Sequence, residues 1–430
     1  MLLVASALAS QAGQVPIDPL CSGVREGIAR VTPSPPARVL PPRTGYCSVS
    51  TTAELRARVV DCRYADIVLQ PGVYEPDDLA QPFLSLPQTR RLWGTTGQTT
   101  LHFGVSLGPH ADTGLHGLVI DVLDPAHAVP VGPAALGNTA AVAFWGAASG
   151  VTLQDTDILG HGLVREGVFA TYADGARVER VGVQGFLRYG VLLEQASAAT
   201  VPATVRDLVV RDVADPAWQA EPWCDPDGLP AGCYAPGTAE AGLWIGLAAL
   251  VERVQIRDVW WSGIETANCG TTCGDPLTGV QLWDVDIDRI GVGSGPAQAG
   301  VGVAFERVTR GAGLREFCIG PDTERGVHAE WNHGDDDQSA AALVIEGGVV
   351  SAHEAGVTFG SGTRDSAVID VLFRNADWAG IGLECCRNAD PDTCATNFFA
   401  ALTFQIDAPD PSCEIAEIVD GGYLGACTCP

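Results

Sequence analysis

Residues 242–266 read GLWIGLAALVERVQIRDVWWSGIET, and this stretch decides the fold. It begins with a short apolar run opened by Gly242, continues through the alternating apolar and polar residues of 251–259, and reaches a second glycine-opened run at Gly263. Alternation with a period of two is typical of β-strands that bury one face, and helical periodicity is absent from the stretch. It therefore predicts a pair of strands followed by the start of a second, similar pair.

The same unit recurs along most of the chain. Other runs opened by glycine are GVFATY at 167, GVLLEQ at 190, GVGVAFE at 300, GVHAEW at 326, GVTFG at 356 and GIGLE at 380, and further alternating runs are 205–213, 280–290 and 368–376. Strands that recur roughly every 23 residues cannot bury an apolar face alone, but they can when stacked coil upon coil. The repeat predicts an all-β chain that forms a single-stranded right-handed parallel β-helix. A propeller is less consistent with the spacing, because its blades need about 40–45 residues each.

The beginning of the repeat carries a helix signal and a resemblance. Thr51 to Glu54 reads TTAE, a capping box, and Leu55 and Val59 follow on one helical face, so a short helix is expected over the first coil. The strand ADIVLQPGVYE at 65–75 comes next. This succession resembles the start of the pectin-lyase-like right-handed β-helix superfamily, and the resemblance implies that the protein contacts carbohydrate.

Four segments are expected along the chain. They are a signal peptide and mature N-terminus at 1–20, a proline-rich lead-in at 21–45, the β-helix at 46–384 and a cysteine-rich cap at 385–430. The apolar start with Ala7-Leu8-Ala9 favours export over an ordinary first strand. The 14 cysteines agree with an exported, disulfide-bonded protein, with Cys47/Cys62, Cys224/Cys233 and Cys269/Cys273 as nearby pairs.

Charge and composition exclude several classes of partner. The formal net charge of −27 repels phosphate backbones, so nucleic-acid binding is not expected. No apolar run approaches the roughly 20 residues that span a bilayer, and we expect a monomer outside the cell or at its surface. The 25 basic residues are all arginine, which excludes the lysine-dependent lyases of the resembling superfamily as exact homologues.

The glycine-opened strands predict which side chains face the bore of the β-helix. Counted from each glycine, positions +1 and +3 should point inward and positions +2 and +4 outward. The inward set is almost uniformly aliphatic: Val168, Ala170, Val191, Leu193, Leu243, Ile245, Ile264, Val301, Val303, Val327, Ala329, Val357, Phe359, Ile381 and Leu383. The outward set contains polar and aromatic residues: Phe169, Thr171, Leu192, Glu194, Trp244, Glu265, His328, Glu330, Thr358 and Glu384.

A candidate site follows from the outward set. Coils lie roughly 4.8 Å apart, so Trp244, Glu265, His328 and Glu330 should share one face within about 15 Å. The catalytic candidates are Glu330, His328, Glu265 and Glu306, because glycoside hydrolysis generally uses paired carboxyl groups. The substrate-binding candidates are Trp244, Glu194 and the loop aromatics Trp218, Trp223 and Tyr234. An ordinary solvated sheet face is the competing interpretation.

Asp335, Asp336 and Asp337 form an acidic run after the strand that carries His328. They are candidate calcium ligands, and a soluble turn is the competing interpretation. Two functions remain open: an exported protein that binds, and as a hydrolase or lyase cleaves, a polysaccharide or cell-surface glycan, or a non-catalytic adhesive β-helix. No other cofactor is indicated.

Overall fold

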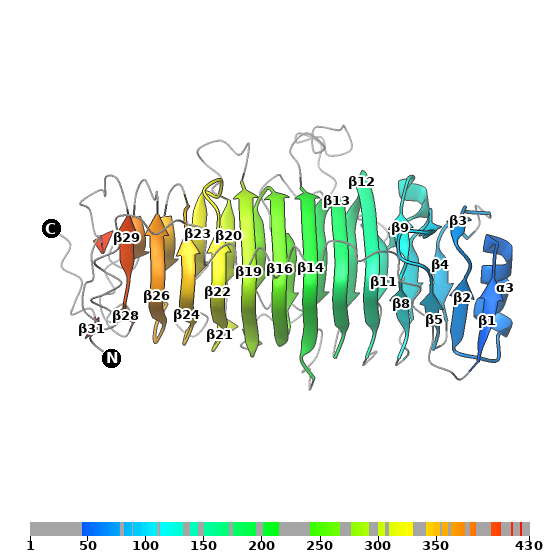
Figure 1. Cartoon of the computed structure of the whole chain (residues 1–430), viewed down its shortest axis with the longest axis horizontal. Helices are drawn as coiled ribbons and strands as arrows, with labels where there is room; N and C mark the ends of the chain where they lie inside the picture. Colours follow the sequence, from blue (N-terminus) through cyan, green and yellow to red (C-terminus); the bar gives the residue numbers. More distant parts are fainter. Residues whose placement is uncertain are drawn as a thin grey trace.

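The computed structural model is an elongated right-handed parallel β-helix, with α3 at one end and β28 at the other (Figure 1). The residues that the structure describes are 45–77, 81–87, 89–108, 110, 112–131, 138–144, 150–171, 175–194, 201–214, 241–266, 277–291, 300–305, 309–329, 341–352, 355–359, 363–374, 379–383, 397–405, 414–415 and 422–423. Among them, no helix is long and apolar enough to cross a membrane. The all-β solenoid predicted from the repeat is confirmed.

Short elements build the first coils. They are β1 (Tyr46–Val49), α3 (Thr52–Asp61), β2 (Asp66–Leu69), β3 (Gly72–Tyr74), β4 (Leu84–Leu86), β5 (Arg91–Trp93), β6 (Thr99–Leu101), β7 (Val105–Leu107), β8 (Gly114–His116), β9 (Val119–Asp121), the 3-10 helix η1 (Pro125–His127) and β10 (Val129–Pro130). Two later strands, β12 (Thr152–Thr171) and β13 (Arg177–Glu194), run around a corner and contribute to two walls of the coil.

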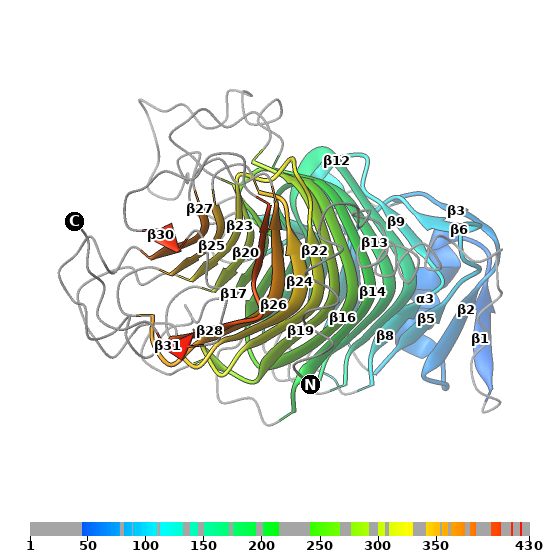
Figure 2. The same ribbon diagram turned by 60° about the vertical axis from the view of Figure 1, so that its left-hand side comes forward.

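The two walls are called here the long sheet and the short sheet. The long sheet continues through β14 (Ala203–Val213), β16 (Ala249–Val259), β19 (Val280–Ile290), β22 (Gly313–Ile319), β24 (Val344–Val350), β26 (Ala367–Arg374), β28 (Phe398–Ala400) and β29 (Thr403–Gln405). The short sheet comprises β4, β7, β11 (Thr139–Phe144), residues 166–171 and 189–194, β15 (Ala241–Gly246), β17 (Ser262–Thr266), β20 (Val301–Phe305), β23 (Arg325–Ala329), β25 (Ala355–Phe359) and β27 (Ala379–Leu383). Figure 2 shows the two walls on opposite sides of the coil.

A ladder of glycines explains why each short strand opens as it does. An added Cβ would lie closer than 3.0 Å to the carbonyl oxygen of the next glycine in the ladder, which holds for Gly167, Gly190, Gly242, Gly263, Gly302, Gly326 and Gly356. The backbones at this corner are therefore too close for any side chain. The ladder member of its coil is Gly302, not Gly300, because Val303 pairs with Ile264 and Val327.

We expect Gly326→Ala to lower the free energy of unfolding by about 1–3 kcal/mol, the usual cost of overpacking. The new methyl group would press on the Gly356 carbonyl oxygen and on Val350 Cγ1, neither of which is the end of a flexible chain. Gly311→Asn is the control, since Gly311 has φ +66 and no atom within 4 Å of an added Cβ, and asparagine tolerates that conformation. Denaturant unfolding measures both, and equal losses would contradict the ladder.

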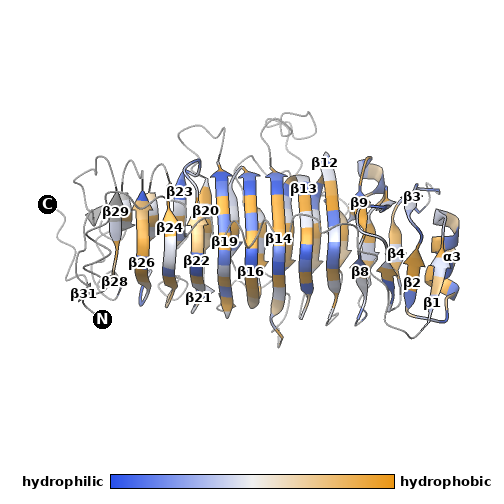
Figure 3. Ribbon diagram, in the orientation of Figure 1, coloured by the Kyte–Doolittle hydropathy of each residue, from blue (hydrophilic) through white to orange (hydrophobic). Residues whose placement is uncertain are grey.

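The bore is lined by the inward set. Every predicted inward residue whose side chain is described lies in the main apolar core, except Val301. Val301 pairs with Ser262 and Arg325 on the outer side of the short sheet, so its predicted direction is wrong. The error follows from counting the strand from Gly300. Polar and apolar residues alternate along β14, β16 and β19 of the long sheet (Figure 3), because every second side chain faces the bore.

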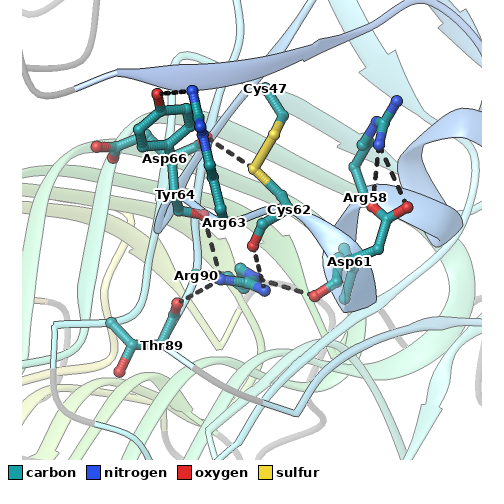
Figure 4. Close-up of a disulfide and its surroundings, with 10 residues drawn as sticks. Cys47, Arg58, Asp61, Cys62, Arg63, Tyr64, Asp66, Thr89 and Arg90 are labelled. Carbon is teal, nitrogen blue, oxygen red and sulfur yellow. Dashed lines mark hydrogen bonds and ion pairs between the residues drawn. A yellow bond between two sulfur atoms is a disulfide. The ribbon is translucent and has the colours of Figure 1, made fainter.

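Both ends of the coil are covered by other chain segments. At the start, Thr51 caps α3 through its side-chain oxygen, as the capping box predicts, and Leu55 and Val59 are buried. The predicted Cys47–Cys62 disulfide ties β1 to the end of α3, where Arg90 donates a hydrogen bond to the Cys62 carbonyl oxygen (Figure 4).

At the far end, β30 (Glu414–Ile415) and β31 (Gly422–Tyr423) pair antiparallel with β27 and β28. Parallel pairing continues through β28 and β29, so the coil extends past residue 384 into the segment expected to be the cap. Of the other predicted cysteine pairs, Cys224/Cys233 and Cys269/Cys273 lie outside the described residues.

Candidate functional site

One column of side chains runs along the outer side of the short sheet. Successive strand pairings place in register Phe169, Leu192, Trp244, Glu265, Ala304, His328 and Thr358. Trp244, Glu265 and His328 therefore share a face, as the repeat predicts. Glu265 and His328 flank the small side chain of Ala304, two coils or roughly 10 Å apart at their Cα atoms.

These side chains point away from the bore, yet they are not solvated. Trp244 is 9% exposed, Glu265 1% and His328 4%. The interpretation of this face as an ordinary wet sheet surface is therefore wrong for these residues. A buried carboxyl and a buried imidazole outside the main core are expensive to maintain, and such groups concentrate at functional sites.

The hydrogen bonds of His328 orient its ring. Nδ1 lies 2.5 Å from Oγ1 of Thr358, the next residue in the column, and that hydroxyl donates to the Val327 carbonyl oxygen at 3.4 Å. The contact holds the plane of the imidazole ring, and the tautomer of His328 decides which of the two atoms donates.

Trp244 belongs to an outer aromatic cluster formed by Tyr189, Leu192, Ala241 and Trp244, with Phe169 packed against it. The Tyr189 and Trp244 rings meet edge to face with centroids 5.7 Å apart. A second outer cluster, formed by Val129, Val131, Ala140 and Ala143, also contacts Phe169. The apolar layer outside the short sheet thus extends over several coils.

Glu166 lies in that layer, at a position that the glycine-opened pattern does not single out, because it precedes Gly167. It is 1% exposed and pairs in register with Ala140 on one side and Tyr189 on the other, one residue from each outer cluster. Burial raises its pKa to about 7, although the charges of Arg165 and Arg188 act to lower it. Its Oε2 atom is buried without a hydrogen-bond partner among the described residues.

Glu194, a predicted binding residue, lies at the other end of the neighbouring short strand. It is half-buried, and this burial raises its pKa, while the charge of Arg188 acts to lower it. Its own charge acts to raise the pKa of Glu166, so the two carboxyl groups are close enough to interact. The guanidinium of Arg188 lies over the Tyr189 ring, 4.6 Å from its centroid.

The long sheet differs, because many of its outer charges are paired between coils. Arg180 binds Asp155, Arg253 binds Asp207 and Arg289 binds Asp258, each through two guanidinium nitrogens, Nε and Nη2. Arg206 and Glu252 add a further pair at 2.7 Å. These contacts join adjacent coils and account for the charges of the residues that they pair.

The remaining candidates lie outside the described residues. They are Glu306, Glu330, Trp218, Trp223, Tyr234, Asp335, Asp336 and Asp337. Within the described ranges, no group of three or more histidine, cysteine, aspartate or glutamate side chains could hold a metal ion. The calcium hypothesis for the acidic run thus stays a prediction.

Comparisons with known proteins support the fold. No family model and no curated protein sequence matches the chain. Among solved structures, the catalytic domain of a GH87 α-1,3-glucanase variant in complex with tetrasaccharides is similar at a TM-score of 0.51 and 12% identity, over 88% of this chain and 70% of that one. The Dettilon tailspike protein (TM-score 0.45, 11% identity, 83% and 58% covered) and an alginate lyase from Paenibacillus sp. (0.39, 10%, 87% and 99%) are also similar. At this identity, the likeness to the glucanase domain shows that the chain shares its β-helical fold.

Proposed function

We propose that this protein is exported and binds a polysaccharide along the outer side of the short sheet. One observation carries the proposal: this side holds buried carboxyl and imidazole groups, Glu166, Glu265 and His328, beside an aromatic cluster. On the corresponding side of the long sheet, many charged side chains are partly exposed and held in ion pairs. Polar groups set into apolar and aromatic surroundings are typical of ligand sites.

The chemistry of this column suits sugars. Tryptophan and tyrosine present flat apolar faces to sugar rings, while carboxylate and imidazole groups hydrogen-bond to hydroxyls. A β-helix also repeats its coils in a straight line, so a polymer can contact several of them at once. The GH87 domain of similar fold is described with bound tetrasaccharides, which makes oligosaccharides a reasonable ligand class to test first.

We expect the mature protein to bind at least one polysaccharide from a panel of neutral glycans and polyuronates, and Glu265→Gln to weaken that binding by about tenfold or more. The amide keeps the shape of the side chain but cannot accept hydrogen bonds at both positions, and an unmatched buried polar group costs about 1–3 kcal/mol. Calorimetry or affinity electrophoresis measures the change.

Glu252→Gln is the matched control, because Glu252 lies on the long sheet in an ion pair with Arg206. It should leave binding unchanged. A folded protein that binds no glycan, with or without added calcium, would favour the adhesive β-helix instead.

A further inference from the structure

We propose that Glu166 is a catalytic general acid that, with Glu194 as its partner carboxylate, hydrolyses a neutral polysaccharide bound on the short sheet. The inference rests on the proposed function and adds a reaction, two residue roles and a substrate class to it. Neither Glu166 nor its pairing with Glu194 follows from the glycine-opened pattern.

The position of Glu166 is the first reason. Its register neighbours Ala140 and Tyr189 belong to the two outer apolar clusters, so Glu166 lies between a residue of each cluster in the sheet. Such surroundings disfavour the charged form, and the pKa of about 7 keeps much of the group protonated near neutrality. A structural carboxyl at this cost would be expected to complete its hydrogen bonds, yet Oε2 has no partner among the described residues.

The second reason is the contrast between the two carboxyl groups. Glu166 is almost fully buried, whereas Glu194 is half-buried, with Arg188 acting on both. Burial raises the pKa of both groups, but Glu166 is the more deeply buried, which favours it as the acid and Glu194 as the base. Tyr189 and Trp244 lie in the next two coils, and their rings form the aromatic part of the cluster beside Glu166.

The reaction balances with water as the only co-reactant. The Glu166 carboxyl donates its proton to the glycosidic oxygen, and the bond between that oxygen and the anomeric carbon breaks. A water molecule bonds to the anomeric carbon and gives its proton to the Glu194 carboxylate. Exchange with solvent then returns a proton to Glu166 and removes one from Glu194.

Charge selects the substrate class. The protein carries a formal net charge of −27, and a polyuronate would bring further carboxylates beside Glu194. The guanidinium of Arg188 already faces the charges of the two glutamates. A neutral glycan avoids this repulsion.

The test measures binding and reducing-end release separately on the mature full-length protein, with neutral glucans, galactans, mannans and xylans and with alginate and pectate. We expect a bound neutral glycan to be cleaved. Glu166→Gln should reduce release by about 10²–10⁴-fold while changing the dissociation constant less than threefold. Glu179→Gln on the long sheet should behave as the wild type.

A pH profile provides a second readout that does not depend on the variant folding. Wild-type release should fall as pH rises through about 7, because Glu166 then loses the proton that it must donate. Unchanged turnover in Glu166→Gln, a profile without this falling limb, or binding of glycans with no cleavage would each overturn the inference while the proposed binding function stands. Absence of any glycan binding would overturn the proposed function itself.

Discussion

Asp66→Ala should lower the free energy of unfolding by about 3 kcal/mol or more. Asp66 is 1% exposed and accepts three hydrogen bonds, two from the guanidinium of Arg91 at 2.7 and 3.0 Å and one from the indole Nε1 of Trp93 at 2.7 Å. Removing one member of a buried charged network leaves its partners unpaired, which typically costs 3–5 kcal/mol. Arg91 retains partial solvent exposure, so we expect the lower end of that range.

The matched control is Asp61→Ala. Asp61 also pairs with an arginine, Arg58, at 3.2 Å, but both side chains are about half exposed, and such surface pairs contribute little. Chemical denaturation of the two variants at one pH and ionic strength measures the difference. If both variants lost the same small amount, the Asp66 network would not stabilise the first coils.

The network also supports the stack above it. The Trp93 ring lies parallel to the ring of His116, its register partner in the next coil, with centroids 3.9 Å apart. Fixing the indole through Asp66 fixes the plane on which the imidazole packs. Asp66→Ala should therefore also change the near-ultraviolet circular dichroism of the tryptophan band, which Asp61→Ala should not.

The sequence predicts the coil well because a β-helix is governed by local rules repeated many times. Gly242 and Gly263 mark positions where backbones approach too closely for a side chain, and the aliphatic residues after them have to fill a narrow bore. Because the same pattern recurs in every coil, a wrongly assigned strand start in one coil disagrees with the strand starts in its neighbours. The direction of Val301 is predicted wrongly because the strand can be counted from Gly300 or from Gly302. Only the pairing with the neighbouring coils distinguishes the two glycines.

The candidate site was only partly predictable. Direction followed from alternation, so Trp244, Glu265 and His328 were placed correctly on one face. The burial of these three side chains could not be predicted from alternation, because it depends on what packs over the sheet rather than on the strand itself. Glu166 precedes its glycine and so fell outside the counted positions. The sequence does carry a signal for Glu166. The equivalent positions in the following coils are Tyr189, Ala241 and Ser262, so a glutamate at this position departs from the repeat.

Glu166 and His116 should make stability depend on pH in opposite directions. The pKa of Glu166 rises from an ordinary 4.5 to about 7 in the folded protein, so the unfolded chain releases this proton first as pH increases. Stability is then lost between pH 4.5 and about 7, and at about 1.4 kcal/mol per pH unit the loss totals about 3 kcal/mol.

For His116, burial lowers the pKa from 6.5 to about 4, against a hydrogen bond with Gln154 that acts to raise it. The unfolded chain therefore takes up this proton first as pH falls. Stability is fully present above pH 6.5 and is lost as pH decreases towards about 4, again by about 3 kcal/mol.

The two windows overlap between pH 4.5 and 6.5, where the slopes oppose each other and nearly cancel in the wild type. Replacing one of the two groups should leave the pH dependence of stability that the other group causes. Glu166→Gln should gain stability as pH rises through this window, and His116→Asn should lose it, each by about 1.4 kcal/mol per pH unit. Urea unfolding at half-unit steps, analysed as variant minus wild type, removes the contribution of the other carboxyl groups. A difference curve for Glu166→Gln that stays flat from pH 4.5 to 7 would show that Glu166 keeps an ordinary proton affinity, and would also remove the chemical reason for assigning it the role of general acid.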